Sequence, residues 1–313
     1  MTAVFWDDMD AACLHGVCLL DGEMAAPDGL LGLRLSWRAL KKPAGGSSWT
    51  FVDRGERYTT RFELYECPDG WLLDVDCEGR GRFLIRPAGI DIDWEGGTGF
   101  QHYLQSIGIA IWLELRGIVC LHANALEHNG SAIGLLAPSG MGKTTLSAKL
   151  LEAGWRFLSD DMLALYRRAS GWTVFPSWPR MRMWPDVGVA LLGSAFEQGK
   201  PVHHRFSKRS VGVGGGCVSN GKSGFPIGTL YVLDRVADAT GSATLIPIGA
   251  AEAAVLLMRN SIIGSASVAL GLQQRRLALI SEILTEVDVI RLRYPYGLRL
   301  LGSVSKLIGR AQN

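Results

Sequence analysis

The sequence lacks an excess of charge of either sign, a long apolar run and a secretion signal. Lys and Arg number 32 against 30 Asp and Glu, and this near balance excludes the strongly basic surface of a nucleic-acid-binding protein. The longest apolar run, Ile107–Leu113, is too short to span a membrane, and the chain starts with acidic rather than basic residues. We therefore expect a cytoplasmic protein that binds neither membranes nor nucleic acids.

Paired cysteine motifs are also missing. The six cysteines are scattered without a C-x-x-C pair, in a chain of 313 residues that is too large to need covalent staples. We expect reduced, mostly buried thiols. His203 and His204 are adjacent, but no third ligand lies at a useful spacing, so a solvated loop is favoured over a metal site.

The patterns present divide the chain into two predicted domains. Residues 1–96 are β-rich: alternating segments such as RYTTRFELYE, WLLDVDC and RFLIRP are separated by turns and predict an antiparallel meander. Nothing in this part indicates chemistry, and a binding module is the alternative to a purely structural role. Residues 97–313 alternate strands with helices, which predicts an α/β domain.

The second part contains several expected elements. Helices are predicted over Phe100–Leu115, Thr144–Ala153, Ala250–Asn260 and Gln273–Leu284, and strands over WRFLSDD, MLALYRR, GWTVFP, TLYVLDR and ATLIPI. Asn129-Gly130 predicts a two-residue hairpin turn between IVCLHANALE and SAIGLLA. The segment 198–226 is long and rich in Gly, Ser and cations, so it is either mobile or functional.

The most informative motif is a phosphate-binding loop at Ala137–Thr145, placed between a strand and a helix. Glycines let the backbone curl around phosphates, and the start of the helix offers free N–H groups to an anion. We expect Lys143 to contact the β- and γ-phosphates of ATP and Thr144 to ligate Mg²⁺. The complete set of expected nucleotide-binding residues is Ser139, Gly140, Met141, Gly142, Lys143, Thr144 and Thr145.

Two acidic residues, Asp160 and Asp161, follow the next strand. Strands on either side of a crossover helix are usually parallel, so their carboxyl ends lie at one edge of the sheet. We therefore expect both carboxylates beside the phosphate loop, where one can hold the metal and the other can accept the proton of an attacking hydroxyl. The pattern does not decide which carboxylate has which role.

His122 is a candidate through the register of the hairpin. If Asn129-Gly130 forms the turn, His128 pairs with Ser131, and position 122 then faces Ala137 at the start of the loop. An imidazole there could position the metal, an anion or the catalytic acid.

Several cationic and aromatic residues lie further along the chain. Arg180 and Arg182 alternate on an expected strand and so point to the same side. Both could anchor a phosphate or substrate, and the alternative is a solvent-exposed face of the strand. Lys208 and Arg209 lie in the long segment and could close over a phosphoryl group. Trp178, Met183 and Trp184 are expected in the core.

Together, the histidine on a strand, the hairpin, the PSGMGKT loop, the helix ending in EAGWRF and the SDD sequence resemble the catalytic domain of the HPr kinase/phosphorylase family. The resemblance covers about residues 118–166 closely and the rest of the second part loosely. It departs from the family at Ala137 and Ala123, where the family has glycine, and at Thr144, where it has serine. The family's N-P-G-R loop is not found.

The resemblance implies a P-loop kinase domain of the HPr kinase/phosphoenolpyruvate carboxykinase type, using ATP and Mg²⁺. It implies Asp160 as the base, Asp161 near the metal, His122 in support, and Arg182 as a weak match to the family's arginine. Segments such as PRMRMWPD also resemble kinases that accompany lasso-peptide clusters.

We therefore expect a serine kinase that acts on a peptide or small protein, with a lasso-type precursor peptide as one acceptor class. The catalytic residues would be His122, Lys143, Asp160 and Asp161. The alternatives are an HPr(Ser) kinase, a small-molecule kinase, a non-catalytic nucleotide sensor and a carboxykinase-type lyase. A homo-oligomer is one option for the assembly.

Overall fold

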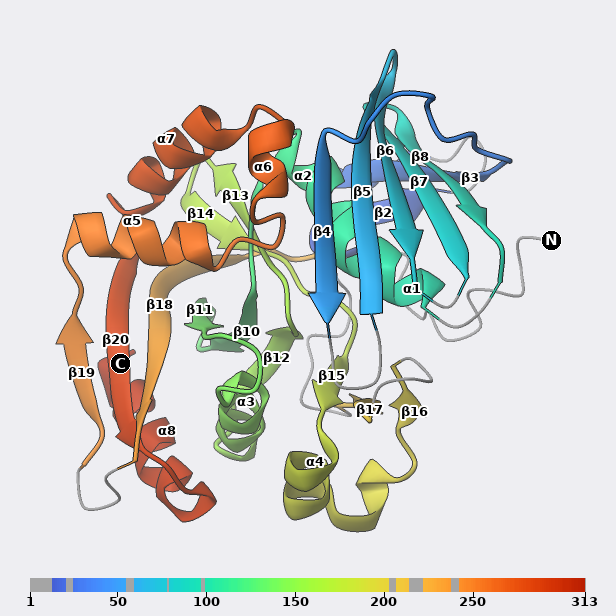
Figure 1. The fold of residues 1–313 in the computed structure, drawn as a ribbon. Coiled ribbons are helices and arrows are strands. Elements are labelled where there is room, and N and C mark those ends of the chain that lie inside the picture. The colour runs from blue at the N-terminus through green and yellow to red at the C-terminus, as the bar shows by residue number, and fades with distance from the viewer. Residues whose placement is uncertain are drawn as a thin grey trace.

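The computed structural model describes residues 13–20, 25–54, 59–77, 79–96, 99–202, 207–213, 222–237 and 242–312. These residues form a mixed α/β structure with three sheets, and the first sheet lies beside the second (Figure 1). None of the helices in these ranges has the length and apolar character needed to cross a membrane.

The N-terminal sheet has eight strands. Residues Thr60, Phe62 and Leu64 alternate toward the core, as the sequence pattern predicts. The strands β5 to β8 form the expected antiparallel meander, but β2 pairs with β3 and β3 with β8 in parallel, so the complete sheet is mixed. In spatial order the strands are β1 (Cys13–Leu14), β2 (Val17–Leu20), β3 (Leu31–Trp37), β8 (Gly89–Trp94), β7 (Arg80–Arg86), β6 (Gly70–Asp76), β5 (Thr59–Cys67) and β4 (Trp49–Arg54).

A helical segment follows this sheet and packs against it. It consists of α1 (Phe100–Tyr103), a π-helical turn (Leu104–Gly108) and α2 (Ile109–Glu114), which confirms the expected helix. One cluster of buried side chains combines the N-terminal sheet and this helix with Met162 and Ile263 of the second part. The predicted boundary between residues 96 and 97 stays a prediction.

The second sheet has nine strands and carries the phosphate loop. The hairpin of β10 (Ala123–His128) and β11 (Ser131–Leu136) has the predicted register, with His128 opposite Ser131. Strand β12 (Arg156–Ser159) is antiparallel to β10, so it runs parallel to β11 as expected. The other strands are β9 (Val119–Leu121), β13 (Leu163–Arg168), β14 (Gly171–Val174), β18 (Phe225–Val236), β19 (Thr244–Pro247) and β20 (Asp288–Pro295).

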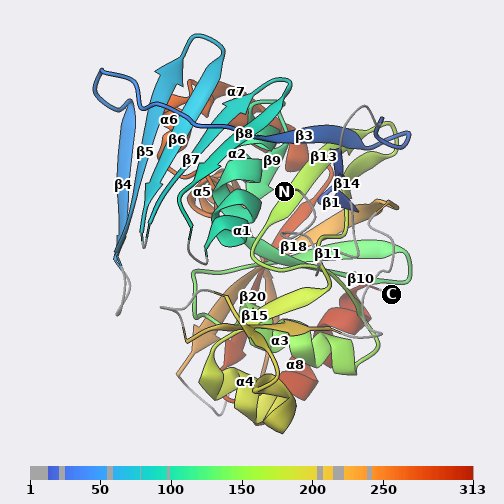
Figure 2. The same cartoon turned by 90° about the vertical axis from the view of Figure 1, so that its right-hand side faces the viewer.

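Helices cover both faces of this sheet (Figures 1 and 2). Ile133 and Leu135 of β11 face the cluster under α3 and α8, whereas Ala132 and Leu136 face the cluster under α5 and α7. Burial on both faces explains why this strand reads as a continuous apolar run. The helices are α3 (Lys143–Glu152), α5 (Ala250–Arg259), α6 (Ala266–Ala269), α7 (Gln273–Ile283) and α8 (Leu301–Ala311), and the predicted α3, α5 and α7 are confirmed.

A small third sheet lies beside the phosphate loop. It contains β15 (Arg180–Met183), β16 (Lys200–Pro201) and β17 (Arg209–Gly212), and the chain between β15 and β16 forms α4 (Pro185–Leu192) and a 3₁₀ turn (Gly193–Phe196). Parts of the expected long segment are therefore strands. His203, His204 and Cys217 lie outside the described residues.

Two expectations about side chains are wrong. Cys13 and Cys18 pair across the β1–β2 hairpin and form a disulfide, so they are not free thiols, whereas Cys67, Cys77 and Cys120 are free. The local turn brings the two cysteines together, a pairing that a search for C-x-x-C spacing misses. Trp184 is 42% exposed at the start of α4 and does not belong to the core, while Met183 is buried and Trp178 is partly buried.

Candidate active site

The phosphate loop joins β11 to α3 and has the backbone shape that its glycines permit. Gly140 and Gly142 have φ angles of 79° and 96°, in the left-handed region that favours glycine. A Cβ atom at Gly142 would also lie 3.2 Å from Arg235 and Tyr294 side-chain atoms. Helix α3 begins after Gly142 without a side-chain cap and without an acidic residue in its first turn. Its first N–H groups and its dipole therefore suit an anion.

Lys143 is held at the base of this loop. Its side chain is buried, with 5% exposure for the residue, and Nζ donates to Ala137 O at 2.7 Å. Burial lowers the pKa of Lys143, and the charges of Asp161 and Asp160 act in the opposite direction. This lysine thus provides a fixed cation beneath the place where phosphate oxygens would lie.

His122 lies between Lys143 and Asp161, next to the phosphate loop as the hairpin register predicts. Its Nε2 lies 3.2 Å from Lys143 Nζ and 3.4 Å from Asp161 Oδ1. Without a proton, Nε2 can accept a hydrogen bond from Lys143; with a proton, it can donate one to Asp161. His122 therefore links the cation and the carboxylate of the site.

Asp161 has an unusual backbone conformation that turns its carboxylate toward the site. Its φ angle is 61°, and its N–H donates to Asn124 Oδ1 at 3.2 Å. Asn124 is fully buried and donates through Nδ2 to Ser147 Oγ of helix α3 at 3.1 Å. A left-handed conformation that its surroundings hold in place is frequent at functional sites. The sequence signal for this contact is Asn124, a polar residue within the apolar HANALE strand.

Asp160 and Asp161 have opposite electrostatic environments. Burial and the neighbouring charge of Asp161 raise the pKa of Asp160 to about 7. Burial would also raise the pKa of Asp161, but the hydrogen bond with His122 and the charges of Lys208 and Arg182 outweigh it and hold the pKa well below its usual range. Asp161 is therefore ionised at neutral pH, while Asp160 is partly protonated.

The two carboxylates also differ in position. Asp160 Oδ2 accepts a hydrogen bond from Arg182 N at 2.7 Å, and its buried Oδ1 accepts none from the described residues. Asp160 lines neither of the two cavities described below, although its pKa suits a base. The role of base implied for Asp160 stays a prediction, and Asp161 is the neighbouring carboxylate that lines both cavities.

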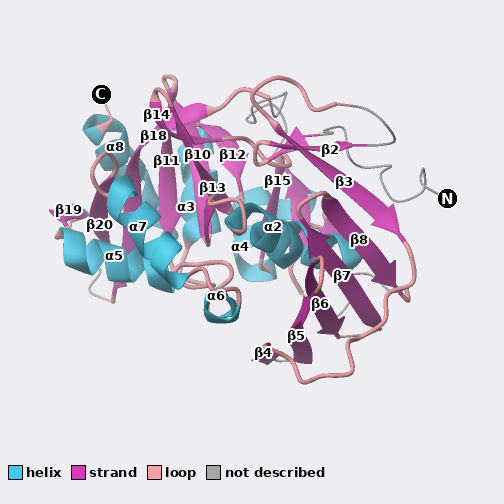
Figure 3. Cartoon of the chain, turned by 90° about the horizontal axis from the view of Figure 1, so that it is seen from above, coloured by secondary structure: helices cyan, strands magenta, loops and turns pink. Residues whose placement is uncertain are grey.

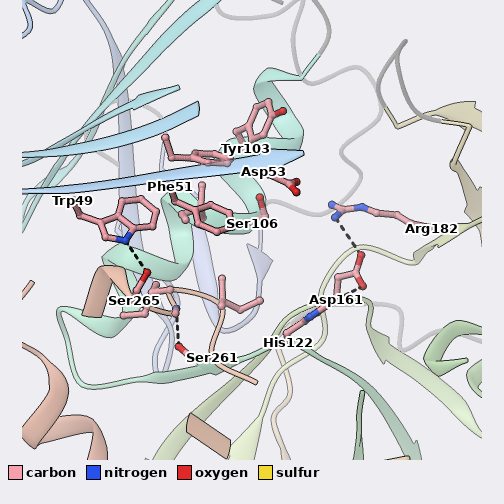
Figure 4. Close-up of a pocket in the computed structure, with 15 residues that line it drawn as sticks. Trp49, Phe51, Asp53, Tyr103, Ser106, His122, Asp161, Arg182, Ser261 and Ser265 are labelled. Atoms are coloured by element: carbon pink, nitrogen blue, oxygen red, sulfur yellow. Dashed lines mark hydrogen bonds and ion pairs between the residues drawn. The ribbon is translucent and has the colours of Figure 1, made fainter. Parts of the chain in front are cut away.

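Two cavities meet at Asp161 and Arg182. The first lies over the phosphate loop and is lined by most of the predicted nucleotide-binding residues: Ser139, Gly140, Gly142, Lys143, Thr144 and Thr145. The second has a volume of about 420 Å³ and lies between the N-terminal sheet, α1 and the α5–α6 loop. Figure 4 shows Asp161, His122 and Arg182 at one end of this second cavity, opposite Trp49, Phe51 and Tyr103.

The predicted cations are placed differently. Arg182 Nη1 lies 3.7 Å from Asp161 Oδ2, and Lys208 lines the first cavity with its Nζ 5.2 Å from the centre of the Trp184 ring. Arg209 instead donates to Gly199 O at 2.7 Å and so fixes the loop before β16. Met141 is 39% exposed and lines neither cavity. Arg182 and Lys208 thus line the cavities, whereas Arg209 and Met141 do not, and the roles expected for Arg209 and Met141 stay predictions.

The donor set fits Mg²⁺ bound together with a nucleotide. Within the described ranges no group of three His, Cys, Asp or Glu residues could hold a metal alone. Mg²⁺ usually keeps waters and binds through one or two protein oxygens plus substrate phosphates. Thr144 and Asp161 both line the first cavity and offer such oxygens.

Comparisons with known proteins add little. No family model matches the chain, and no curated protein matches it in sequence. Among solved structures, the HPr(Ser) kinase/phosphatase from Coxiella burnetii is similar at 12% identity and a TM-score of 0.32, over 62% of this chain and 95% of that one. A similarity this weak supports no conclusion about this chain, so the functional argument depends on the geometry of the site.

Proposed function

We propose that this protein is an ATP- and Mg²⁺-dependent kinase that transfers the γ-phosphoryl group to a serine hydroxyl of a peptide or small protein. The observation that carries the proposal is the position of Asp161, whose carboxylate lines both the phosphate-loop cavity and the second cavity. A phosphoryl donor in one cavity and a hydroxyl in the other would meet at this side chain.

In the proposed reaction, the serine oxygen forms a bond to the γ-phosphorus while the bond to the β–γ bridging oxygen breaks and ADP leaves. Asp161 orients the hydroxyl and accepts its proton late in the transfer, when the oxygen becomes acidic. Lys143 and the N–H groups of α3 neutralise charge on the phosphates. Arg182, which borders both cavities, is suited to the transferred group.

Bound Mg²⁺ would neutralise charge on the β- and γ-phosphates, and Thr144 would hold it as the sequence predicts. Asp161 has two carboxylate oxygens, so it could contribute one to the metal and present the other to the acceptor. Asp160 acts at a distance: it fixes β15, and with it Arg182, through the hydrogen bond to the backbone of Arg182.

Mass spectrometry of serine peptides incubated with Mg-ATP and the protein tests the proposal. We expect a serine to gain one phosphoryl group and one ADP to form for each transfer. The Lys143→Ala variant should show neither product. ATP binding without transfer to any hydroxyl, under conditions where the protein is folded, would contradict the proposal.

A further inference from the structure

The second cavity has the chemistry of a binding site, and its aromatic wall belongs to the N-terminal sheet, for which a binding module is the alternative to a purely structural role. Strand β4 places Trp49, Phe51 and Asp53 at alternate positions along this cavity. The side chain of Phe51 is large and apolar, yet the residue is 47% exposed. Exposed aromatic residues that line a concave surface commonly contact a ligand.

The aromatic rings form a continuous row that leads into the protein. Ring centroids of Trp49 and Phe51 lie 5.9 Å apart, and those of Phe51 and Phe62 lie 6.3 Å apart, both stacked. Phe62 contacts Tyr103 of α1 edge-on at 5.7 Å. Phe62 and Tyr103 are buried and therefore hold the exposed rings in place. The wall is thus apolar and rigid, which suits an aromatic or branched aliphatic group.

The opposite wall is fixed to the catalytic residues. Residues 260–265 of the α5–α6 loop contribute Ile262 and Ile263 to the cavity. His122 N donates to Asn260 O at 2.6 Å, and Trp49 Nε1 donates to Ser265 Oγ at 2.8 Å. The loop therefore connects the aromatic wall with His122, which lies between β9 and β10, and a ligand held between the two walls has a defined distance to Asp161.

The shape of the sheet favours a peptide as the occupant. Strand β4 is the last strand of the N-terminal sheet and lies next to α6 (Figures 1 and 3). Among the described residues no strand pairs with the outer side of β4, and an extended peptide can pair with the edge strand of a sheet. A small hydroxylated compound has no peptide backbone that could pair with this edge.

We infer that the second cavity seats the acceptor as a peptide segment whose serine points to Asp161 and whose aromatic or branched aliphatic residue, within two positions of that serine, contacts Trp49 and Phe51. This inference rests on the proposed kinase function. It assigns substrate selection to the N-terminal sheet and phosphoryl transfer to the second sheet.

The test uses short peptides with a central serine in a Gly/Ala background. One set carries Phe at each flanking position, and the matched set carries Asp there. Initial rates with Mg-ATP are measured for wild type, Phe51→Ala and the control Phe51→Leu, which keeps an apolar side chain. We expect Phe peptides to be preferred by about 10-fold in kcat/KM, a preference that Phe51→Ala loses and Phe51→Leu largely keeps, with ATP affinity unchanged in both.

A second readout separates binding from catalysis. In protein labelled with 5-fluorotryptophan, the ¹⁹F resonance of Trp49, assigned with Trp49→Phe, should shift saturably with Phe peptides and not with Asp peptides. Equal rates for both sets and an unmoved resonance would overturn the inference while the kinase function stands. A saturable shift without phosphoryl transfer would support peptide binding in the second cavity and contradict the proposed kinase function. Absence of both signals would overturn both.

Discussion

The phosphate-loop region and the N-terminal sheet differ in how their contributions to the site are encoded. Around the phosphate loop, a contiguous motif, one helix and one strand place Lys143, Thr144 and Asp161 in a single cavity. In the N-terminal sheet, no motif exists, and Trp49 and Phe51 reach the site only because the whole sheet packs beside the α5–α6 loop. The residues that we propose for phosphoryl transfer are therefore close in sequence, whereas the residues that we propose for acceptor binding come together only in the tertiary structure.

The largest expected effect belongs to the phosphate loop. Replacing Lys143 with Ala should reduce phosphoryl transfer by about 1,000-fold, because a buried cation that neutralises phosphate charge is lost. Transfer of labelled phosphate from ATP measures the loss. Lys149→Ala is the matched control: this half-buried lysine lies on the same helix and pairs with Glu152, so the rate should change less than about 2-fold. If Lys143→Ala kept a tenth of the activity, the predicted asymmetry between the two regions would be wrong.

A buried ion pair allows a test of whether the two regions fold as one unit. Glu114 of α2 and Arg276 of α7 form a pair in which both side chains are at most 2% exposed. Arg276→Ala leaves the carboxylate buried without its partner and should lower the free energy of unfolding by about 3–5 kcal/mol, measured by urea denaturation. The exposed pair of Glu252 and Arg291 is the control, and Arg291→Ala should cost about 1 kcal/mol or less.

The shape of the same denaturation curve is also informative. Because one hydrophobic cluster includes side chains from both regions, we expect a single transition for wild type. Two separate transitions, with Arg276→Ala affecting only one of them, would show that the N-terminal sheet and the phosphate-loop region fold independently.

Asp160 should produce an effect on stability that depends on pH. The folded protein retains the proton of Asp160 up to about pH 7, whereas the unfolded chain releases it near the ordinary value of 3.8. Between these values the unfolded state binds fewer protons, so this group lowers stability as pH rises, and the full penalty is present above about pH 7. Asp160→Asn removes the titration and should raise the free energy of unfolding by up to roughly 4 kcal/mol at about pH 8.

Thermal unfolding over this pH range checks the prediction. The difference between Asp160→Asn and wild type should shrink toward about pH 4. A difference that is constant with pH would mean that Asp160 is ionised throughout and that its burial has no electrostatic cost.

The smallest effect is expected in the N-terminal sheet. Trp49→Phe keeps an aromatic ring, although a smaller one, and removes the hydrogen bond to Ser265, which should raise KM for the acceptor a few-fold and cost about 1 kcal/mol or less in stability. Steady-state kinetics with Ser265→Ala and the double variant completes a double-mutant cycle. If the effects of the two substitutions were additive, the hydrogen bond between Trp49 and Ser265 would not determine the position of the aromatic wall.

Sequence reasoning succeeded where one local rule decides the structure. Asn129-Gly130 defined the hairpin register and so placed His122 next to the phosphate loop. The crossover through α3 brought the end of β12 to the same edge as the end of β11. These rules depend on backbone geometry over a few residues, and a single sequence contains all of the required information.

Sequence reasoning failed where distant contacts decide. Asp160 and Asp161 are neighbours, and contacts from distant parts of the chain, among them Asn124 with the backbone of Asp161 and His122 with its carboxylate, give the two side chains different environments. Trp184 has the apolar character of a core residue, but it lies at an exposed helix start beside Lys208. Strand β20 and helix α8 were not predicted, although both are part of the second half's core.

We propose that Asp161, and not Asp160, is the carboxylate between donor and acceptor. A single-turnover measurement of phosphoryl transfer in Asp161→Asn and Asp160→Asn, with ATP binding measured separately, distinguishes the two carboxylates. We predict that Asp161→Asn loses at least about 100-fold in rate and that Asp160→Asn stays within about 10-fold of wild type, both with ATP bound. The reverse order, with Asp160→Asn inactive and Asp161→Asn active, would contradict the account.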